Sequence, residues 1–340
     1  MAFRIGTGWP GGASNILMKV WILPLAALLA VPASPQEATI KVDVAVVNIL
    51  CSVRTKSGGL VANMNKEDFT ISENGEKQEI KYFARETDLP LTIGLLVDVS
   101  LSQERLIDTE RQAASQFFST VLREKDLAFL ISFGQDAELI QDYTNSHKLL
   151  QRGLDGLRAN GPVGGLHPGP VPTASQPRGT ILFDTVYMAS AEQLKGQVGR
   201  KALVIITDGV DQGSRYKIDQ AIKAAQLADA IIYGVYYVDQ AAYGYGWGMG
   251  GGFGNVGDRD LRRMAEETGG RVLRVDRKHT LQDVFREIQE EMRSQYAIGY
   301  SPTNPNKDGG FRKIDVKLMD KELKAQARKG YFAVAAGAAE

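Results

Sequence analysis

Cysteine and histidine are almost absent from this chain. Of its 340 residues, one is a cysteine, Cys51, and three are histidines. A single cysteine cannot form an internal disulfide, so packing alone must hold the fold even in an oxidising compartment. We expect Cys51 to be a buried strand residue. The scarcity of both residue types also argues against a Cys/His catalytic dyad or a His/Cys metal cluster.

The chain also has no excess charge of either sign. It carries 40 basic and 40 acidic residues, for a formal net charge of +0. A chain without a basic field offers no electrostatic attraction to nucleic acid or to an anionic membrane surface. With 44% hydrophobic and 24% charged residues, it is long enough for one large domain and one small one.

Long apolar runs are missing too, except near the start of the chain. Lys19 precedes the apolar stretch 20–29, and Val31-Pro32-Ala33 offers small residues for cleavage. This pattern predicts a secretory signal peptide over residues 1–34, because the stretch is too short for a comfortable membrane span. Met18 is an alternative start, and an uncleaved signal anchor is the competing interpretation. We expect a secreted or periplasmic protein with no membrane span after cleavage.

Two β-rich segments are predicted, one on each side of the middle of the chain. Residues 35–88 begin with alternating apolar and polar side chains over 40–50, and they contain a hairpin with Asn74-Gly75 at its tip. In the second segment, 295–335, strands are predicted at 296–300, 312–318 and 324–332. Neither segment alone has enough strands for a sandwich. We therefore predict that the two pair into one small β-sandwich-like domain.

Between these flanks, residues 89–294 alternate between buried strands and amphipathic helices. The strands are predicted at 91–98, 127–133, 137–141, 201–207, 231–238 and 271–275. The helices are predicted at 103–122, 146–157, 182–194, 216–229, 258–268 and 280–294. This βαβ rhythm indicates an α/β fold with a doubly wound, mainly parallel sheet and helices on both faces.

Oxygen-bearing side chains follow the first of these strands. Asp98, Ser100 and Ser102 come at steps of two after an apolar run, a spacing that directs three oxygens to one side of an extended or loosely turning loop. One carboxylate and two hydroxyls suit a hard cation such as Mg²⁺. The carboxyl ends of strands are also where open α/β sheets place their ligands. The alternative is that Asp98 and Ser100 are helix N-caps.

Three elements together resemble the von Willebrand factor A (vWA) domain and its metal-ion-dependent adhesion site. They are Asp98-x-Ser100-x-Ser102 after a buried strand, Gly179-Thr180 at a helix start, and Thr207-Asp208-Gly209 at a strand end. The resemblance implies a Rossmann-like sheet of strand order 3-2-1-4-5-6, with the 137–141 strand antiparallel at one edge. The flanks resemble, more loosely, those of secreted bacterial proteins with a vWA-related domain.

The resemblance implies a metal role for five side chains. Ser100, Ser102 and Thr180 would coordinate Mg²⁺ or Mn²⁺, Asp98 would supply charge directly or through water, and Asp208 would accept hydrogen bonds from metal-bound water. The physical chemistry agrees, because two carboxylates offset the charge of the ion while neutral hydroxyls keep it electrophilic. An Asp or Glu of a protein partner would fill the remaining position.

A glycine-rich stretch after the predicted strand 231–238 is the other unusual feature. It carries the aromatic residues Tyr243, Tyr245, Trp247 and Phe253. Aromatic side chains on a flexible backbone, at the sheet edge of the predicted metal, suit a partner-contact surface. The alternative is a low-complexity insertion with no fixed role. Near the predicted site, Asp211 is interpreted as a turn residue and Asp184 as a solvated or capping group.

Three functions are compatible with these patterns. The first is an adhesion-type, metal-dependent binding module, and the second is a structural cell-envelope or assembly protein whose metal only rigidifies loops. The third, a metal-dependent hydrolase, is disfavoured because Ser100 stands where a phosphohydrolase would have a second Asp. The chain also has no Walker loop and no activating base placed near a serine. We therefore predict a protein that is not an enzyme.

Overall fold

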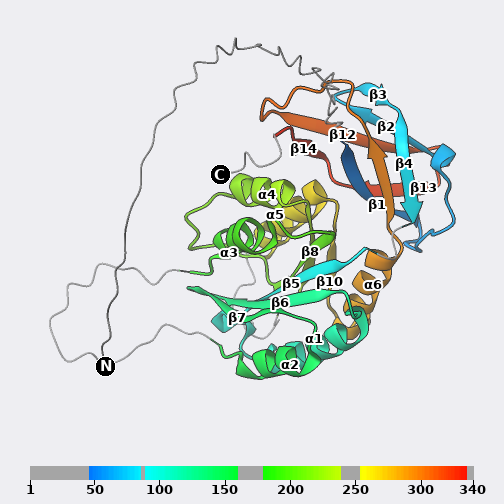
Figure 1. Ribbon diagram of the computed structural model, residues 1–340. Helices are drawn as coiled ribbons and strands as arrows, with labels where there is room; N and C mark the ends of the chain where they lie inside the picture. The colour runs from blue at the N-terminus through cyan, green and yellow to red at the C-terminus, as the bar shows by residue number, and fades with distance from the viewer. Residues whose placement is uncertain (1–45, 86–88, 160–178, 239–252, 335–340) are drawn as a thin grey trace, which may run out of the picture. The chain divides into compact units, whose positions relative to one another are not determined.

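The structure is a computed structural model, and it describes residues 46–85, 89–159, 179–238 and 253–334. Two parts make up this portion of the chain, an α/β part and a β-sandwich-like part (Figure 1). The predicted signal peptide over 1–34 lies outside the described residues. Among the described residues, no helix has both the length and the apolar character needed to cross a bilayer.

The α/β part is built on one six-stranded sheet (Figure 1). In spatial order its strands are β10 (Val272–Arg274), β9 (Ala230–Tyr236), β8 (Arg200–Thr207), β5 (Leu91–Asp98), β6 (Leu127–Phe133) and β7 (Ala137–Thr144). Only β7 is antiparallel to its neighbour, and it lies at one edge. In chain order this arrangement is 3-2-1-4-5-6, so the predicted strand order and the antiparallel edge strand are confirmed.

Helices cover both faces of this sheet, and each face has its own apolar core. One core contains side chains of α1 (Ile107–Val121), α2 (His147–Gly156) and α6 (Leu281–Arg293). The other contains side chains of α3 (Leu182–Met188), its π-helical continuation η3 (Ala189–Leu194), α4 (Ile218–Leu227) and α5 (Phe253–Thr268). The central strand β5 is buried along its whole length, as expected for a strand covered on both faces.

The flanks form two four-stranded sheets, each of which mixes strands from before and after the α/β part. The first sheet has the order β13 (Leu323–Ala327), β1 (Val47–Thr55), β11 (Tyr296–Tyr300) and β4 (Ile80–Arg85). The second has the order β14 (Gly330–Phe332), β12 (Phe311–Leu318), β2 (Phe69–Glu73) and β3 (Glu76–Gln78). A shared apolar core lies between them. The α/β part is therefore an insertion in a small β-sandwich-like domain.

Some local predictions for the flanks are confirmed and others are wrong. Asn74 and Gly75 form the hairpin tip with φ of 51° and 88°, the left-handed values that this two-residue turn requires. The sequence predicts the first strand over 40–50, whereas β1 runs over Val47–Thr55 within the described residues. The single strand expected over 324–332 is two strands, because β13 pairs with β1 and β14 pairs with β12 in the other sheet.

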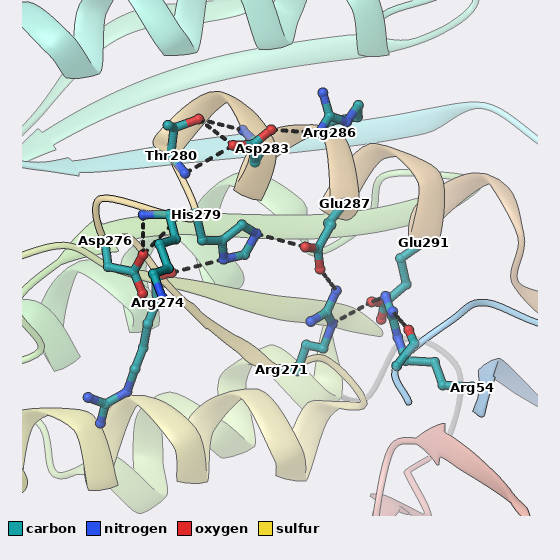
Figure 2. A network of polar contacts seen from close by, with 12 residues as sticks. Arg54, Arg271, Arg274, Asp276, His279, Thr280, Asp283, Arg286, Glu287 and Glu291 are labelled. Atoms are coloured by element: carbon teal, nitrogen blue, oxygen red, sulfur yellow. Dashed lines mark hydrogen bonds and ion pairs between the residues drawn. The ribbon is translucent and has the colours of Figure 1, made fainter. Parts of the chain in front are cut away.

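A buried ion cluster joins the two parts of the structure (Figure 2). Glu291 of α6 has no exposed side-chain surface, and its Oε2 lies 2.5 Å from a terminal guanidinium nitrogen of Arg54 in β1. The same oxygen accepts a hydrogen bond from Nε of Arg271 at 2.7 Å. A buried carboxylate is tolerated where such pairing satisfies it. The last helix of the α/β part is thus tied to the first strand of the flanking domain.

Candidate metal centre

Asp98 ends β5, and its carboxylate is fully buried. Oδ1 accepts a hydrogen bond from the main-chain N–H of Ser100 at 3.0 Å, and Oδ2 accepts one from Oγ1 of Thr207 at 2.6 Å. Thr207 is the last residue of β8, which runs parallel to β5. Because parallel neighbours end at the same edge of a sheet, the two motifs meet at the carboxyl ends of these strands.

A chain of hydroxyl contacts continues from this carboxylate to the second one. The Oγ atoms of Ser100 and Ser102 lie 3.0 Å apart, and Oγ of Ser102 donates to Oδ2 of Asp208 at 2.8 Å. The serines are presented by a short 3₁₀ turn, η2 (Leu101–Gln103), rather than by an extended loop. Ser100 occupies the N-cap position of this turn, but its side chain makes no capping hydrogen bond. The N-cap interpretation therefore does not account for the side chain of Ser100.

The turn after Asp208 depends on Gly209. This residue has φ of +78°, and a Cβ built on it would lie 2.4 Å from the main-chain oxygen of Gly257 in α5. Only glycine avoids both the strain and the clash. The turn is held by main-chain N–H groups, since Gly209 donates to Oγ1 of Thr207 at 2.9 Å and Val210 donates to Oδ1 of Asp208 at 3.1 Å.

Thr180 lies in the loop that leads into α3, and its main chain is tied to the loop after Asp208. The carbonyl oxygen of Thr180 accepts hydrogen bonds from the N–H groups of Gln212 at 3.0 Å and Gly213 at 3.1 Å. A Cβ on Gly179 would lie 2.3 Å from Cβ of Gln212, so the two loops are in close contact. The structure therefore brings the Thr180 loop against the segment that begins at Asp208.

Two further carboxylates hold these loops together by capping main-chain N–H groups. Oδ1 of Asp211 accepts from Phe183 at 3.2 Å at the start of α3. Oδ1 of Asp184 accepts from Arg215 and Tyr216, at 2.8 Å each. Asp184 is thus a capping group. Neither Asp184 nor Asp211 takes part in the contacts that run from Asp98 through the two serines to Asp208. Both residues fix the loop that carries Thr180 relative to the Asp208 turn.

The electrostatics of the cluster favour a cation. The pKa of Asp98 is raised to about 6, first by burial and then by the charge of Asp208, against the hydrogen bonds from Ser100 and Thr207 that lower it. Two carboxylates that repel each other across hydroxyl groups match the donor set of a hard divalent ion. Within the described residues, no three His, Cys, Asp or Glu side chains gather as a metal site. A metal here would therefore depend on the hydroxyl oxygens.

A third carboxyl group, Glu110 of α1, belongs to the surroundings of this cluster and was not predicted from the sequence. Its side chain is fully buried, and neither oxygen has a hydrogen-bond partner among the described residues. Burial, followed by the charge of Asp98, raises its pKa well above the usual value. The available signal was its helical position, because Glu110 falls between Ile107 and Ala114 on the apolar face of α1.

The residues of the predicted aromatic surface cannot be placed in the same way. Tyr243, Tyr245 and Trp247 lie outside the described residues, and Phe253 begins α5 with a side chain that also lies outside the described part. Their role in partner contact therefore stays a prediction. The metal roles of Asp98, Ser100, Ser102, Thr180 and Asp208 also stay predictions, although the structure places these residues on adjoining loops.

No protein-family model matches this chain, and no curated protein matches it either. Solved structures do match. BatB from Bacteroides thetaiotaomicron is 16% identical over 60% of this chain and 99% of its own, with a TM-score of 0.42. An aerotolerance-related membrane protein from Bacteroides fragilis is 16% identical over 59% of this chain and 98% of its own, with a TM-score of 0.43.

A third match is proximal thread matrix protein 1 from the mussel byssus, with a zinc-occupied metal-ion-dependent adhesion site. It is 14% identical over 62% of this chain and 50% of its own, with a TM-score of 0.43. The strand order and the helices on both faces are those that the sequence resemblance implied. The α/β part has a vWA-like fold.

Proposed function

We propose that this protein is a secreted or periplasmic binding module of the adhesion type that recognises a protein partner through a divalent cation. Ser100, Ser102 and Thr180 would coordinate Mg²⁺ or Mn²⁺, with Asp98 and Asp208 supplying negative charge. The observation that carries the proposal is the continuous chain of contacts from Asp98 through the two serines to Asp208. The bound ion would act as a Lewis acid for a carboxylate oxygen of the partner.

The residues themselves support binding rather than turnover. The Oγ atoms of Ser100 and Ser102 contact each other, and Ser102 donates to a carboxylate; among the described residues, no histidine or lysine hydrogen-bonds to either serine. A serine nucleophile needs such an activating base. Neutral hydroxyls do suit an ion that must keep affinity for one more anionic ligand. That ligand would be an Asp or Glu side chain on the partner.

A second candidate function is a structural role in the cell envelope, in which the ion only rigidifies the loops. The burial of both carboxylates favours it, since Asp98 is fully buried and Asp208 is 5% exposed. The two candidates differ in whether an ion held here still accepts a partner carboxylate. A structural ion would stabilise the fold without making the capture of any protein depend on metal.

Affinity capture from an extracytoplasmic fraction, with Mg²⁺ or with EDTA, tests the proposal. We expect a partner that is retained in Mg²⁺, released by EDTA and lost with Asp208→Asn. Asp155→Asn is the matched control, because Asp155 is an exposed carboxylate of α2. Capture that persists undiminished in EDTA would overturn the adhesion proposal. Metal-dependent stability without metal-dependent capture would favour the structural alternative.

A further inference from the structure

A cavity lies at the end of the six-stranded sheet opposite the candidate metal centre, where the parallel strands β8 and β9 begin. Its walls include the first residues of two strands, Arg200 and Lys201 of β8 and Ile231 of β9. The candidate metal centre lies instead at the carboxyl ends of β5 and β8. The cavity has a volume of about 260 Å³. Since a water molecule occupies about 30 Å³ of liquid, the cavity has room for roughly eight non-hydrogen atoms.

Positive charge dominates the walls of this cavity. Three cationic side chains line it, Arg200, Lys201 and Arg328, against one carboxylate, Asp229. Both terminal nitrogens of Arg328 already have partners. One lies 2.5 Å from Oδ1 of Asp229, and the other donates to the carbonyl oxygen of Asn48 at 2.6 Å. The carboxylate is thus used by Arg328, and the lining as a whole keeps more positive than negative charge.

Among the cationic side chains of the cavity, Lys201 is the best placed to bind an anionic ligand. Its Nζ donates to the carbonyl oxygen of Gln197 at 3.0 Å, and an ammonium group has three donors. Burial lowers the pKa of Lys201; the charge of Asp229 opposes this effect, and that of Arg328 adds to it. An ammonium group that has lost water and lies near another cation gains from an anionic ligand.

Apolar side chains from both parts of the structure also line the cavity, beside the polar residues Asn48, Gln226 and Thr268. Leu50 of β1 belongs to the flanking domain, whereas Leu89 and Ile231 belong to the α/β part. Ile231 is buried, and Leu50 is partly buried. A ligand that fills the cavity would therefore place a short hydrocarbon segment against these side chains and its charged group toward Lys201.

We propose that this cavity binds a small organic anion, with a phosphate or carboxylate head beside Lys201 and Arg328 and a short hydrocarbon body against Leu50 and Ile231. Because the cavity takes side chains from β1 and from Arg328 as well as from β8 and β9, the ligand bridges the flanking domain and the α/β part. Occupancy stabilises the folded chain, by an amount that grows with the logarithm of the ligand concentration above Kd. The proposal is independent of the candidate metal centre.

Calorimetric titration and thermal unfolding of the full chain test this site, with n-butyl phosphate and pentanoate as probes in EDTA at constant ionic strength. We expect at least one probe to bind and to raise Tm, and the comparison shows which head group the cavity prefers. Lys201→Gln should weaken binding by about tenfold or more, whereas Lys201→Arg should retain it. Lys148→Gln, an exposed lysine of α2, is the matched control and should bind as the wild type does.

The apolar wall has its own test. Leu50→Ala should weaken binding of n-butyl phosphate more than binding of inorganic phosphate, because only the first has a hydrocarbon body to lose contact. The proposal is overturned if neither probe binds the wild-type chain at millimolar concentration. It is also overturned if Lys201→Gln and Lys148→Gln bind the probes equally well.

Discussion

The ionised carboxylate of Asp98 is disfavoured, because it is fully buried and lies near the charge of Asp208. The free energy of unfolding should therefore depend on pH. The pKa of Asp98 in the metal-free fold is about 6, against an ordinary value of 3.8. A raised carboxyl pKa means that the fold binds the proton more tightly than the unfolded chain does. The contribution of protonated Asp98 to the free energy of unfolding is therefore complete below about pH 4, and it is lost as the pH rises through about 6.

Replacing Asp98 by a neutral residue should restore the stability that is lost when its carboxyl group ionises. In EDTA at pH 7 we expect Asp98→Asn to be more stable than the wild type by up to about 3 kcal/mol, the equivalent of a shift of roughly two pKa units. The same variant should gain nothing from Mg²⁺, because it lacks one of the two charges that offset the ion. Urea unfolding with and without Mg²⁺ measures both effects. A variant that is less stable than the wild type in EDTA would contradict the assignment of buried charge.

The buried carboxyl group of Glu110, which has no predicted metal role, should also lower the stability of the fold when it ionises. Its folded-state pKa lies well above the usual value, so its contribution to stability falls as the pH rises above the pKa in the unfolded chain. Glu110→Gln should remove that dependence and become progressively more stable than the wild type as the pH rises above about 5. Glu104→Gln, an exposed carboxylate just before α1, should follow the wild-type profile. Parallel profiles for Glu110→Gln and wild type would refute this.

At the scale of elements, α6 is the helix that ties the α/β part to the flanking domain. Glu291 of α6 is fully buried between Arg54 of β1 and Arg271 (Figure 2). Removing one partner of a buried ion pair leaves an uncompensated charge, which typically costs about 3–5 kcal/mol. We expect Glu291→Gln to lose stability of that order in urea unfolding. Glu290→Gln, the exposed neighbour, should change it by less than about 0.5 kcal/mol, and equal losses would contradict the account.

The elements were predictable to different degrees, for physical reasons. Buried runs such as 91–98 and 127–133 indicate strands whatever their partners, and the apolar periodicity of α1 and α6 indicates helices. The local pattern predicts one strand over 324–332, although apolar and polar side chains alternate only over 324–328. The chain changes sheets at Arg328 and Lys329, and that change depends on the partners β1 and β12, which local pattern does not contain.

At the scale of the whole molecule, each sheet of the flanking domain needs strands from both ends of the chain. β1 pairs with β11 and β13, and β2 pairs with β12. A fragment of residues 35–88 therefore lacks the central neighbours of its own strands. We expect this fragment to show the circular dichroism of an unfolded chain. Cooperative thermal unfolding of the isolated fragment would contradict the insertion.

The same limit applies to the candidate site. Asp98, Ser100, Ser102 and Asp208 were found from the sequence because strand ends carry a readable signal, the abrupt change from apolar to oxygen-bearing residues. The contact of the Thr180 loop with Gln212 and Gly213 follows from tertiary packing, and a resemblance was needed to anticipate it. Glu110 has only the weaker signal of its position on the apolar face of α1. The cavity around Lys201 has no local signal, because it is formed by elements distant in the sequence.

Calorimetric titration of the full chain with Mg²⁺ tests the central claim most directly, in parallel with the variants Thr180→Val and Asp208→Asn. The account predicts one Mg²⁺ ion bound per chain in the wild type and loss of that binding in both variants, each of which should still fold. A wild-type chain that takes up no Mg²⁺ or Mn²⁺, or variants that bind the ion as well as the wild type does, would contradict it.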